Sequence, residues 1–242
     1  MVTLEKKTQS DSKQQNTSLS VWPLFVFSLT TTLLVAAFYA AFSKELPIKF
    51  EVFVAIALLN GAVRFFYLSK KAGAWKDDLN IRESWVGRQI LAYVLFVPLS
   101  SLWLLFPQQN ELGLLATILG LLTLVSIDNI YRQLPSKKEN KYHSADVLFF
   151  TVFLYVAILV FNPWMFFGAL ILKAYLYITR KIMFQKEGED TRLVFSVLRI
   201  LLGFILPVIL FFVSGFDTVN YSVLISVVSG EVIDRIEFYL EL

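Results

Sequence analysis

The chain has 242 residues, of which 57% are hydrophobic and 17% charged, and its formal net charge is +3 at pH 7. A soluble domain of this composition would expose more apolar surface than water tolerates, so we expect an all-α polytopic membrane protein. The sequence has no cysteine, which excludes disulfides, iron–sulfur clusters and thiolate metal sites in this chain. We expect its basic residues to lie in loops beside lipid headgroups, which argues against nucleic acid as a partner.

Residues 1–20 are polar and almost without large apolar side chains, and predict a disordered tail. Residues 21–242 predict one transmembrane domain of about eight helices, because runs of about 20 apolar residues match a hydrocarbon core of roughly 30 Å. The expected spans are 21–42, 50–69, 85–106, 112–131, 145–161, 164–179, 193–213 and 218–239. Only Asn162 and Pro163 separate the short fifth and sixth spans, which favours a tight helical hairpin over a re-entrant pair.

Basic residues indicate how the helices are oriented, because Lys and Arg are disfavoured in translocated loops. Fifteen of them lie in the tail and in every second connection: Lys6, Lys7, Lys13, Lys70, Lys71, Lys76, Arg82, Arg132, Lys137, Lys138, Lys141, Arg180, Lys181, Lys186 and Arg192. Only Lys44 and Lys49 lie in the opposite connections. We therefore predict a multi-pass protein with both termini in the cytoplasm.

Several ionisable side chains fall inside the predicted spans, where each costs roughly 2.5–3.5 kcal/mol on insertion scales. They are Arg64, Arg88, Asp128, Lys173, Arg199, Glu231, Asp234, Arg235 and Glu237. By the predicted orientation, most lie toward the cytoplasmic ends of their helices. They either snorkel to the interface and pair with one another, or form a polar pocket in the cytoplasmic half.

The last span holds the densest group of charges. Glu231 and Arg235 are spaced i, i+4 and can form an intrahelical ion pair, with Asp234 beside them. This pair is either structural, allowing the helix to insert, or handles protons, and Asp128 of the fourth span is a further candidate for proton handling. Gly230 lets a neighbouring helix or a flat ligand approach the backbone.

The sequence contains no set of residues that would ligate haem or a catalytic metal. The single histidine, His143, falls in a polar loop, and no cluster of histidines and carboxylates has metal-ligand spacing. No Gly-rich phosphate loop precedes a lysine, and no nucleophile lies near a base, so ATPase and hydrolase functions have no support. We predict no haem, no metal and no catalytic residue in this chain.

Four stretches of the chain carry motifs that occur together in one family. Trp22-Pro23-Leu24 opens the first span, Ser84 to Leu91 opens the third, Arg199 lies early in the seventh, and the stretch from Gly230 to Tyr239 closes the eighth. In this order they resemble the membrane-anchor subunit of dimethyl sulfoxide reductase. That family begins with Trp-Pro-Leu, has Ser-Trp-x-Ser-Arg-Glu-Ile-Leu at the third helix, and ends with Gly-Glu, an Arg four residues after the Glu, and Phe-Tyr.

The resemblance implies a subunit that oxidises menaquinol during anaerobic electron transport at a bacterial inner (plasma) membrane. Its partners would be an iron–sulfur electron-transfer subunit and a molybdopterin catalytic subunit. The quinol site of the family uses a His late in the second helix and the Glu of the third-helix motif, and these positions fall on Tyr67 and Gln89. Arg88 would line the same quinol headgroup and orient one of its oxygens.

Neither substituted residue accepts a proton readily at neutral pH, since tyrosine is a poor proton acceptor and a glutamine amide cannot take up a proton. Quinol oxidation releases two protons, so Glu231, Asp234, Asp128 or water would have to take them. Three alternatives stay open: a rewired quinol site, a quinol site elsewhere, or a redox-inactive assembly or scaffold subunit. A small-solute or proton-coupled transporter would use the same intramembrane charges.

Overall fold

The computed structural model describes residues 2–44, 46–70, 81–133, 145–186, 192–214 and 221–241. Every element within these residues is a helix. They are α1 (Val2–Lys44), α2 (Phe50–Lys70), α4 (Trp85–Leu105), α5 (Asn110–Gln133), α6 (Ala145–Leu159), α7 (Pro163–Lys186), α8 (Leu193–Ile200), the π-helix η1 (Leu201–Ile205), α9 (Leu206–Ser214) and α10 (Tyr221–Glu241). The all-α prediction is therefore confirmed for the described residues, and α8, η1 and α9 follow one another as a single rod.

Among the described residues, five segments are long and apolar enough to cross a bilayer. They are Trp22–Ser43, Phe50–Leu68, Trp85–Leu105, Asn110–Ile130 and Leu193–Val213. In α6 the apolar segment is shorter, Leu148–Leu159, while α7 and α10 carry most of the buried charges. The fold is thus compatible with a multi-pass membrane protein, and the count of eight spans stays a prediction.

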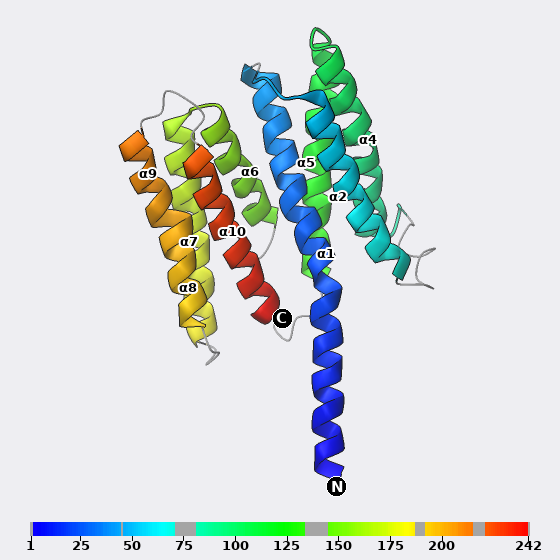
Figure 1. The fold of residues 1–242 in the computed structure, drawn as a ribbon, viewed down its shortest axis with the longest axis vertical. Helices are drawn as coiled ribbons and strands as arrows, with labels where there is room; N and C mark the ends of the chain where they lie inside the picture. The colour runs from blue at the N-terminus through cyan, green and yellow to red at the C-terminus, as the bar shows by residue number, and fades with distance from the viewer. Residues whose placement is uncertain are drawn as a thin grey trace.

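The disorder predicted for residues 1–20 stays a prediction. Helix α1 begins at Val2 and continues without a break into the first apolar segment. In Figure 1 its N-terminal part extends beyond the ends of the other helices. Residues 2–20 contain neither glycine nor proline and are rich in Lys and Gln, so nothing in them interrupts a helix already nucleated by the apolar segment.

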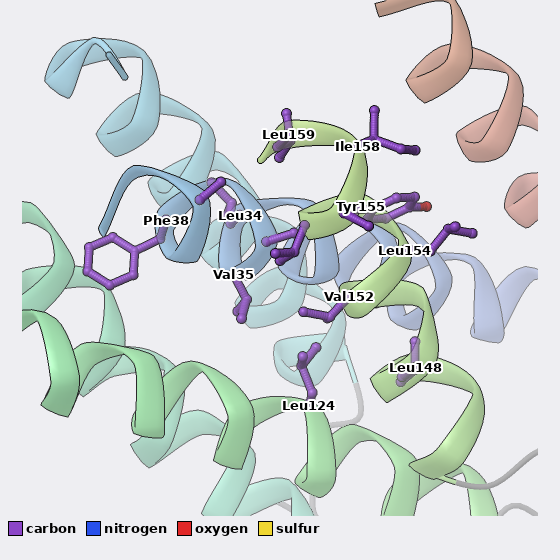
Figure 2. Packing of buried hydrophobic residues seen from close by; sticks show 14 of the residues in the cluster. Leu34, Val35, Phe38, Leu124, Leu148, Val152, Leu154, Tyr155, Ile158 and Leu159 are labelled. Carbon is purple, nitrogen blue, oxygen red and sulfur yellow. The ribbon is translucent and has the colours of Figure 1, made fainter. Parts of the chain in front are cut away.

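The helices form two groups joined through α1 and through the packing of α5 on α6. Figure 1 shows α1, α2, α4 and α5 in one group, and α6, α7, the α8–η1–α9 rod and α10 in the other. Helix α1 packs against α2 and α5 and also against α6 and α10 of the second group. At this junction Val35 of α1, Leu124 of α5, and Val152 and Leu154 of α6 belong to one buried apolar core (Figure 2).

Two glycines allow the π-helix η1 and α10 to cross with their backbones in contact. A Cβ atom built on Gly230 would lie 2.4 Å from the Cα atom of Gly203. Close by, the Ser226 hydroxyl donates to the carbonyl of Leu202 inside the π-turn, at 2.6 Å. This crossing brings the start of the α8–η1–α9 rod against the face of α10 that carries its carboxylates.

Candidate functional site

Buried polar side chains gather in two clusters, one in each group of helices. The first, which we call the amide cluster, consists of Thr31, Asn60, Arg64, Gln89 and Tyr93 from α1, α2 and α4. The second, which we call the ion network, consists of Thr151, Lys173, Arg180, Lys181, Arg199, Glu231, Asp234 and Glu237 from α6, α7, α8 and α10. The end of α2, the start of α4, the start of α8 and the end of α10 lie at one end of the bundle (Figure 1), so both clusters extend from the middle of their helices toward that end.

Helical spacing assembles the amide cluster. Asn60 and Arg64 are four residues apart on α2, and Gln89 and Tyr93 are four residues apart on α4, so each pair lies on one face of its helix. Ser84 begins α4 as its N-cap, and its hydroxyl accepts from the backbone N–H of Val86 at 3.1 Å. The two faces meet so that Arg64 is opposite Gln89 and Asn60 is opposite Tyr93.

Arg64 and Gln89 form the charged end of this cluster. Nη2 of Arg64 donates to Oε1 of Gln89 at 2.9 Å, and the two residues are 5% and 0% exposed. The Arg64 guanidinium also lies 5.8 Å from the ring centres of both Phe27 and Tyr67, within range of a cation–π interaction. The structure therefore brings two of the three residues predicted for the quinol site, Tyr67 and Gln89, to one arginine.

Arg88, the third residue predicted for the quinol site, is directed elsewhere. Its Nε donates to the carbonyl of Ile81 at 3.0 Å and its Nη2 to the carbonyl of Arg82 at 2.6 Å, while the guanidinium lies 4.3 Å from the ring of Trp85. Adjacent residues on a helix point about 100° apart, so Arg88 and Gln89 do not share a face. Arg88 closes the connection before α4 and does not line the amide cluster.

Asn60 and Tyr93 form the other end of the amide cluster, and the sequence analysis missed both. Nδ2 of Asn60 donates to Oγ1 of Thr31 at 2.9 Å and to the Tyr93 hydroxyl at 3.3 Å. The Tyr93 hydroxyl in turn donates to the carbonyl of Ala57 at 2.7 Å. The signal that could have found them is their spacing of four residues from Arg64 and Gln89, respectively.

The ion network is organised by three carboxylates on α10. Glu231, Asp234 and Glu237 are spaced three residues apart and so follow one side of the helix, and their exposures are 1%, 4% and 0%. The cations that face them come from neighbouring helices: Lys173, Arg180 and Lys181 from α7 and Arg199 from α8. Within the described residues this network joins four cations to three carboxylates.

Glu231 occupies the deepest position of the network. It forms an ion pair with Lys173, its Oε1 accepts from Nη2 of Arg199 at 2.7 Å, and its Oε2 accepts from the Thr151 hydroxyl at 3.1 Å. Lys173 also donates to Thr151, which ties α6 to α7. Beside this group the hydroxyl of Tyr155, a fully buried residue, has no hydrogen-bond partner among the described residues.

Asp234 and Glu237 continue the network toward the end of α10. Arg180 bridges them, with Nη2 2.7 Å from Oδ1 of Asp234 and 3.5 Å from Oε2 of Glu237. Lys181 approaches Oε1 of Glu237 at 2.6 Å, and the Tyr177 hydroxyl donates to Oε2 at 3.0 Å. The three carboxylates thus link α7 and α8 to α10 through side-chain ion pairs, in addition to the close packing of α8 on α10.

The sequence predicted an ion pair between Glu231 and Arg235 of the same helix. It did not predict the partners of Glu231 on α7 and α8. Glu231 forms its ion pairs with Lys173 and Arg199, because helices α7 and α8 direct cations at this side of α10. Arg235 donates to the hydroxyl of Ser28 and so links α10 to α1.

Asp128 of α5, the remaining candidate for proton handling, is 2% exposed. His143 lies outside the described residues.

An apolar cavity of about 180 Å³ lies between α1, α5 and α6, lined among others by Val35, Leu121 and Phe153. We assign no chemistry to it, because its lining is almost wholly apolar. The described residues also contain no group of three or more His, Asp or Glu side chains that could hold a metal ion. The polar chemistry of the described bundle is therefore concentrated in the amide cluster and the ion network.

No family model, no characterised protein and no solved structure matches this chain. The resemblance to the anchor subunit of dimethyl sulfoxide reductase therefore depends on the sequence motifs alone.

Proposed function

We propose that the chain is the membrane-anchor, quinol-interacting subunit of a molybdopterin and iron–sulfur oxidoreductase complex similar to dimethyl sulfoxide reductase. It spans a bacterial inner membrane eight times with both termini in the cytoplasm, and passes electrons from menaquinol to a partner iron–sulfur subunit. The observation that carries this proposal is Gln89, which is fully buried and hydrogen-bonded to Arg64. Its Nε2 atom has no hydrogen-bond partner among the described residues.

The orientation of the Gln89 amide follows from its neighbour. Arginine has only donors, so the oxygen of the amide must face Arg64 and the nitrogen must face away from it. A buried donor without an acceptor costs about 1–3 kcal/mol, which a ligand that brings an acceptor recovers. A quinone oxygen is such an acceptor, and Tyr67 and Phe27 beside Arg64 offer aromatic surface to a flat ring.

Oxidation of menaquinol releases two electrons and two protons, and the amide cluster can keep neither. Gln89 and Arg64 do not accept protons at neutral pH, so the protons pass to carboxylates or water, for which Glu231, Asp234 and Asp128 remain the candidates. The electrons leave through iron–sulfur clusters of the partner subunit. The role of this chain is to bind and orient the quinol next to that partner.

Purification of the native complex tests the proposal. We expect an iron–sulfur protein and a molybdopterin protein to co-purify with the chain. We also expect Gln89→Leu to lower kcat/KM for menadiol oxidation about tenfold, which is the effect of losing one hydrogen bond to a buried group. Arg88→Ala is the matched control, because Arg88 is adjacent in sequence but outside the amide cluster, and its activity should stay within about twofold. A complex without redox partners, or equal activity of both variants, contradicts the proposal.

A second candidate function is proton-coupled transport of a small solute. The observation that favours it is the ion network, because buried charges shared between several helices are typical of coupled substrate sites. In that case the chain alone, reconstituted in vesicles, should move a solute or acidify the lumen, and Lys173→Met should abolish the movement. The anchor proposal predicts no such movement by the isolated chain.

A further inference from the structure

The carbonyl oxygen of the Asn60 side chain, Oδ1, is buried and has no hydrogen-bond partner among the described residues. The neighbours of Asn60 hold it in this orientation. The Tyr93 hydroxyl donates its own hydrogen to the carbonyl of Ala57, so it can only accept from Asn60, and the carbonyl of Phe27, 3.4 Å from Nδ2, is likewise only an acceptor. Rotating the amide by half a turn would place its oxygen against these acceptors.

Gln89 supplies the complementary atom. Its Nε2 is a buried donor without a partner among the described residues, and Arg64 holds it in that orientation. Asn60 and Arg64 lie four residues apart on α2, about 6 Å along the axis, as do Tyr93 and Gln89 on α4. An unsatisfied acceptor and an unsatisfied donor therefore lie on successive turns of the same interface between α2 and α4.

We propose that these two atoms recognise a hydroxyl-bearing aromatic ring, and that Asn60 makes the amide cluster selective for the reduced, hydroquinone form of its ligand. The inference rests on the proposed quinol function and adds a residue that determines specificity. Each hydroxyl of a hydroquinone both donates and accepts, so the ligand can donate to Oδ1 of Asn60 and accept from Nε2 of Gln89. The oxygens of a quinone only accept, and therefore satisfy Gln89 but not Asn60.

Burial makes this difference measurable. Asn60 is 2% exposed and Gln89 is 0% exposed, so bulk water does not compensate for a missing partner at either atom. A site that hydrogen-bonds a ligand hydroxyl discriminates strongly against an analogue without it, since its own buried polar group is left unsatisfied. For one such hydrogen bond we expect the hydroquinone to bind about tenfold more tightly than the quinone.

The experiment measures the binding of menadione and of its reduced form, menadiol, to the full-length protein in nanodiscs by anaerobic equilibrium dialysis. We expect the unaltered protein to bind menadiol about tenfold more tightly, and Asn60→Leu to remove this preference by weakening menadiol binding alone. Gln89→Leu should weaken the binding of both forms. Asn129→Leu is the control, because the Asn129 amide donates within its own helix, to the carbonyl of Val125 at 2.8 Å.

The outcomes separate this inference from the function on which it rests. If neither form binds, the quinol function is wrong and the selectivity falls with it. If both forms bind equally tightly, or if the preference survives Asn60→Leu, quinone binding stands but Asn60 does not select the reduced form, and a bound water is the partner of Oδ1. The comparison of the two forms on the unaltered protein decides the question even if Asn60→Leu does not fold.

Discussion

At the scale of single residues, burial decides how much each charge of this protein contributes. An ion pair at an aqueous surface contributes little to stability, because water and salt screen it. Lys173 and Glu231 are 3% and 1% exposed, and Glu231 also faces Arg199, which is 1% exposed. Removing this one carboxylate would leave Lys173 without its ion-pair partner and Arg199 with only Asp234, whose Oδ2 lies 3.8 Å from Nη2, which is strongly unfavourable.

Glu231→Gln tests this dependence on one carboxylate. The variant keeps the size of the side chain and removes its charge, so we expect a loss of about 3–5 kcal/mol of stability, the usual effect of breaking a buried ion pair. The measurement is thermal unfolding in detergent, followed by tryptophan fluorescence. Glu111→Gln, at the exposed start of α5, is the control and should unfold with the unaltered protein. An unchanged unfolding temperature for Glu231→Gln would show that the network does not stabilise the bundle.

The sequence predicted which polar residues lie at membrane depth but not which of them meet. Hydropathy and spacing are local properties, and they placed Arg64, Lys173 and Glu231 inside spans. The cationic partners of Glu231 lie 58 and 32 residues away along the chain, and no local pattern encodes that proximity. Asn60 was missed because an uncharged amide in an apolar run gives a weak signal.

At the scale of helices, boundaries were more predictable than contacts. The third span was expected at 85–106 and α4 is Trp85–Leu105, because Ser84 caps its start. A tight turn is present at Asn162 and Pro163, where α6 packs on α7 and Oδ1 of Asn162 accepts from the N–H of Met165 at 3.0 Å. The choice between a spanning hairpin and a re-entrant pair stays a prediction. The π-helix η1 was not predicted, because it depends on α10 passing across it.

The crossing of η1 and α10 makes a prediction for Gly230. In Gly230→Ala the added methyl would lie 2.4 Å from Cα of Gly203, and backbone cannot move aside as a flexible side chain can, so we expect a loss of about 1–3 kcal/mol of stability. Gly168→Ala is the matched control, since no atom lies within 4 Å of its added methyl. Alanine is favoured over glycine in helices by about 0.5–1 kcal/mol, so this control should unfold at the same or a higher temperature. Equal stability of the two variants would refute the close backbone crossing.

At the scale of the whole molecule, both clusters extend toward the end of the bundle where α2, α5 and α7 end and where α4 and α8 begin. The amide cluster lies near the end of α2 and the start of α4, and the ion network extends along α10 toward its C-terminal end (Figure 1). If that end faces the cytoplasm, the proposed quinol site lies near the cytoplasmic surface, and the proposed redox partners would have to dock there. The orientation therefore decides on which side of the membrane these proposed partners must be sought.

The absence of cysteine from the sequence allows this orientation to be tested with single introduced cysteines. Glu83, before α4, and Gln108, between α4 and α5, are both exposed and lie at opposite ends of α4. Because translocation of basic loops is disfavoured, we expect a membrane-impermeant maleimide to label Gln108→Cys on intact cells and Glu83→Cys only in inverted vesicles. Both replaced residues are exposed, so both variants should insert normally. The unaltered chain, which has no cysteine, should show no labelling. The reverse pattern would place both clusters and any docked redox partner on the outer face, since the charge rule would then have assigned every connection to the wrong side.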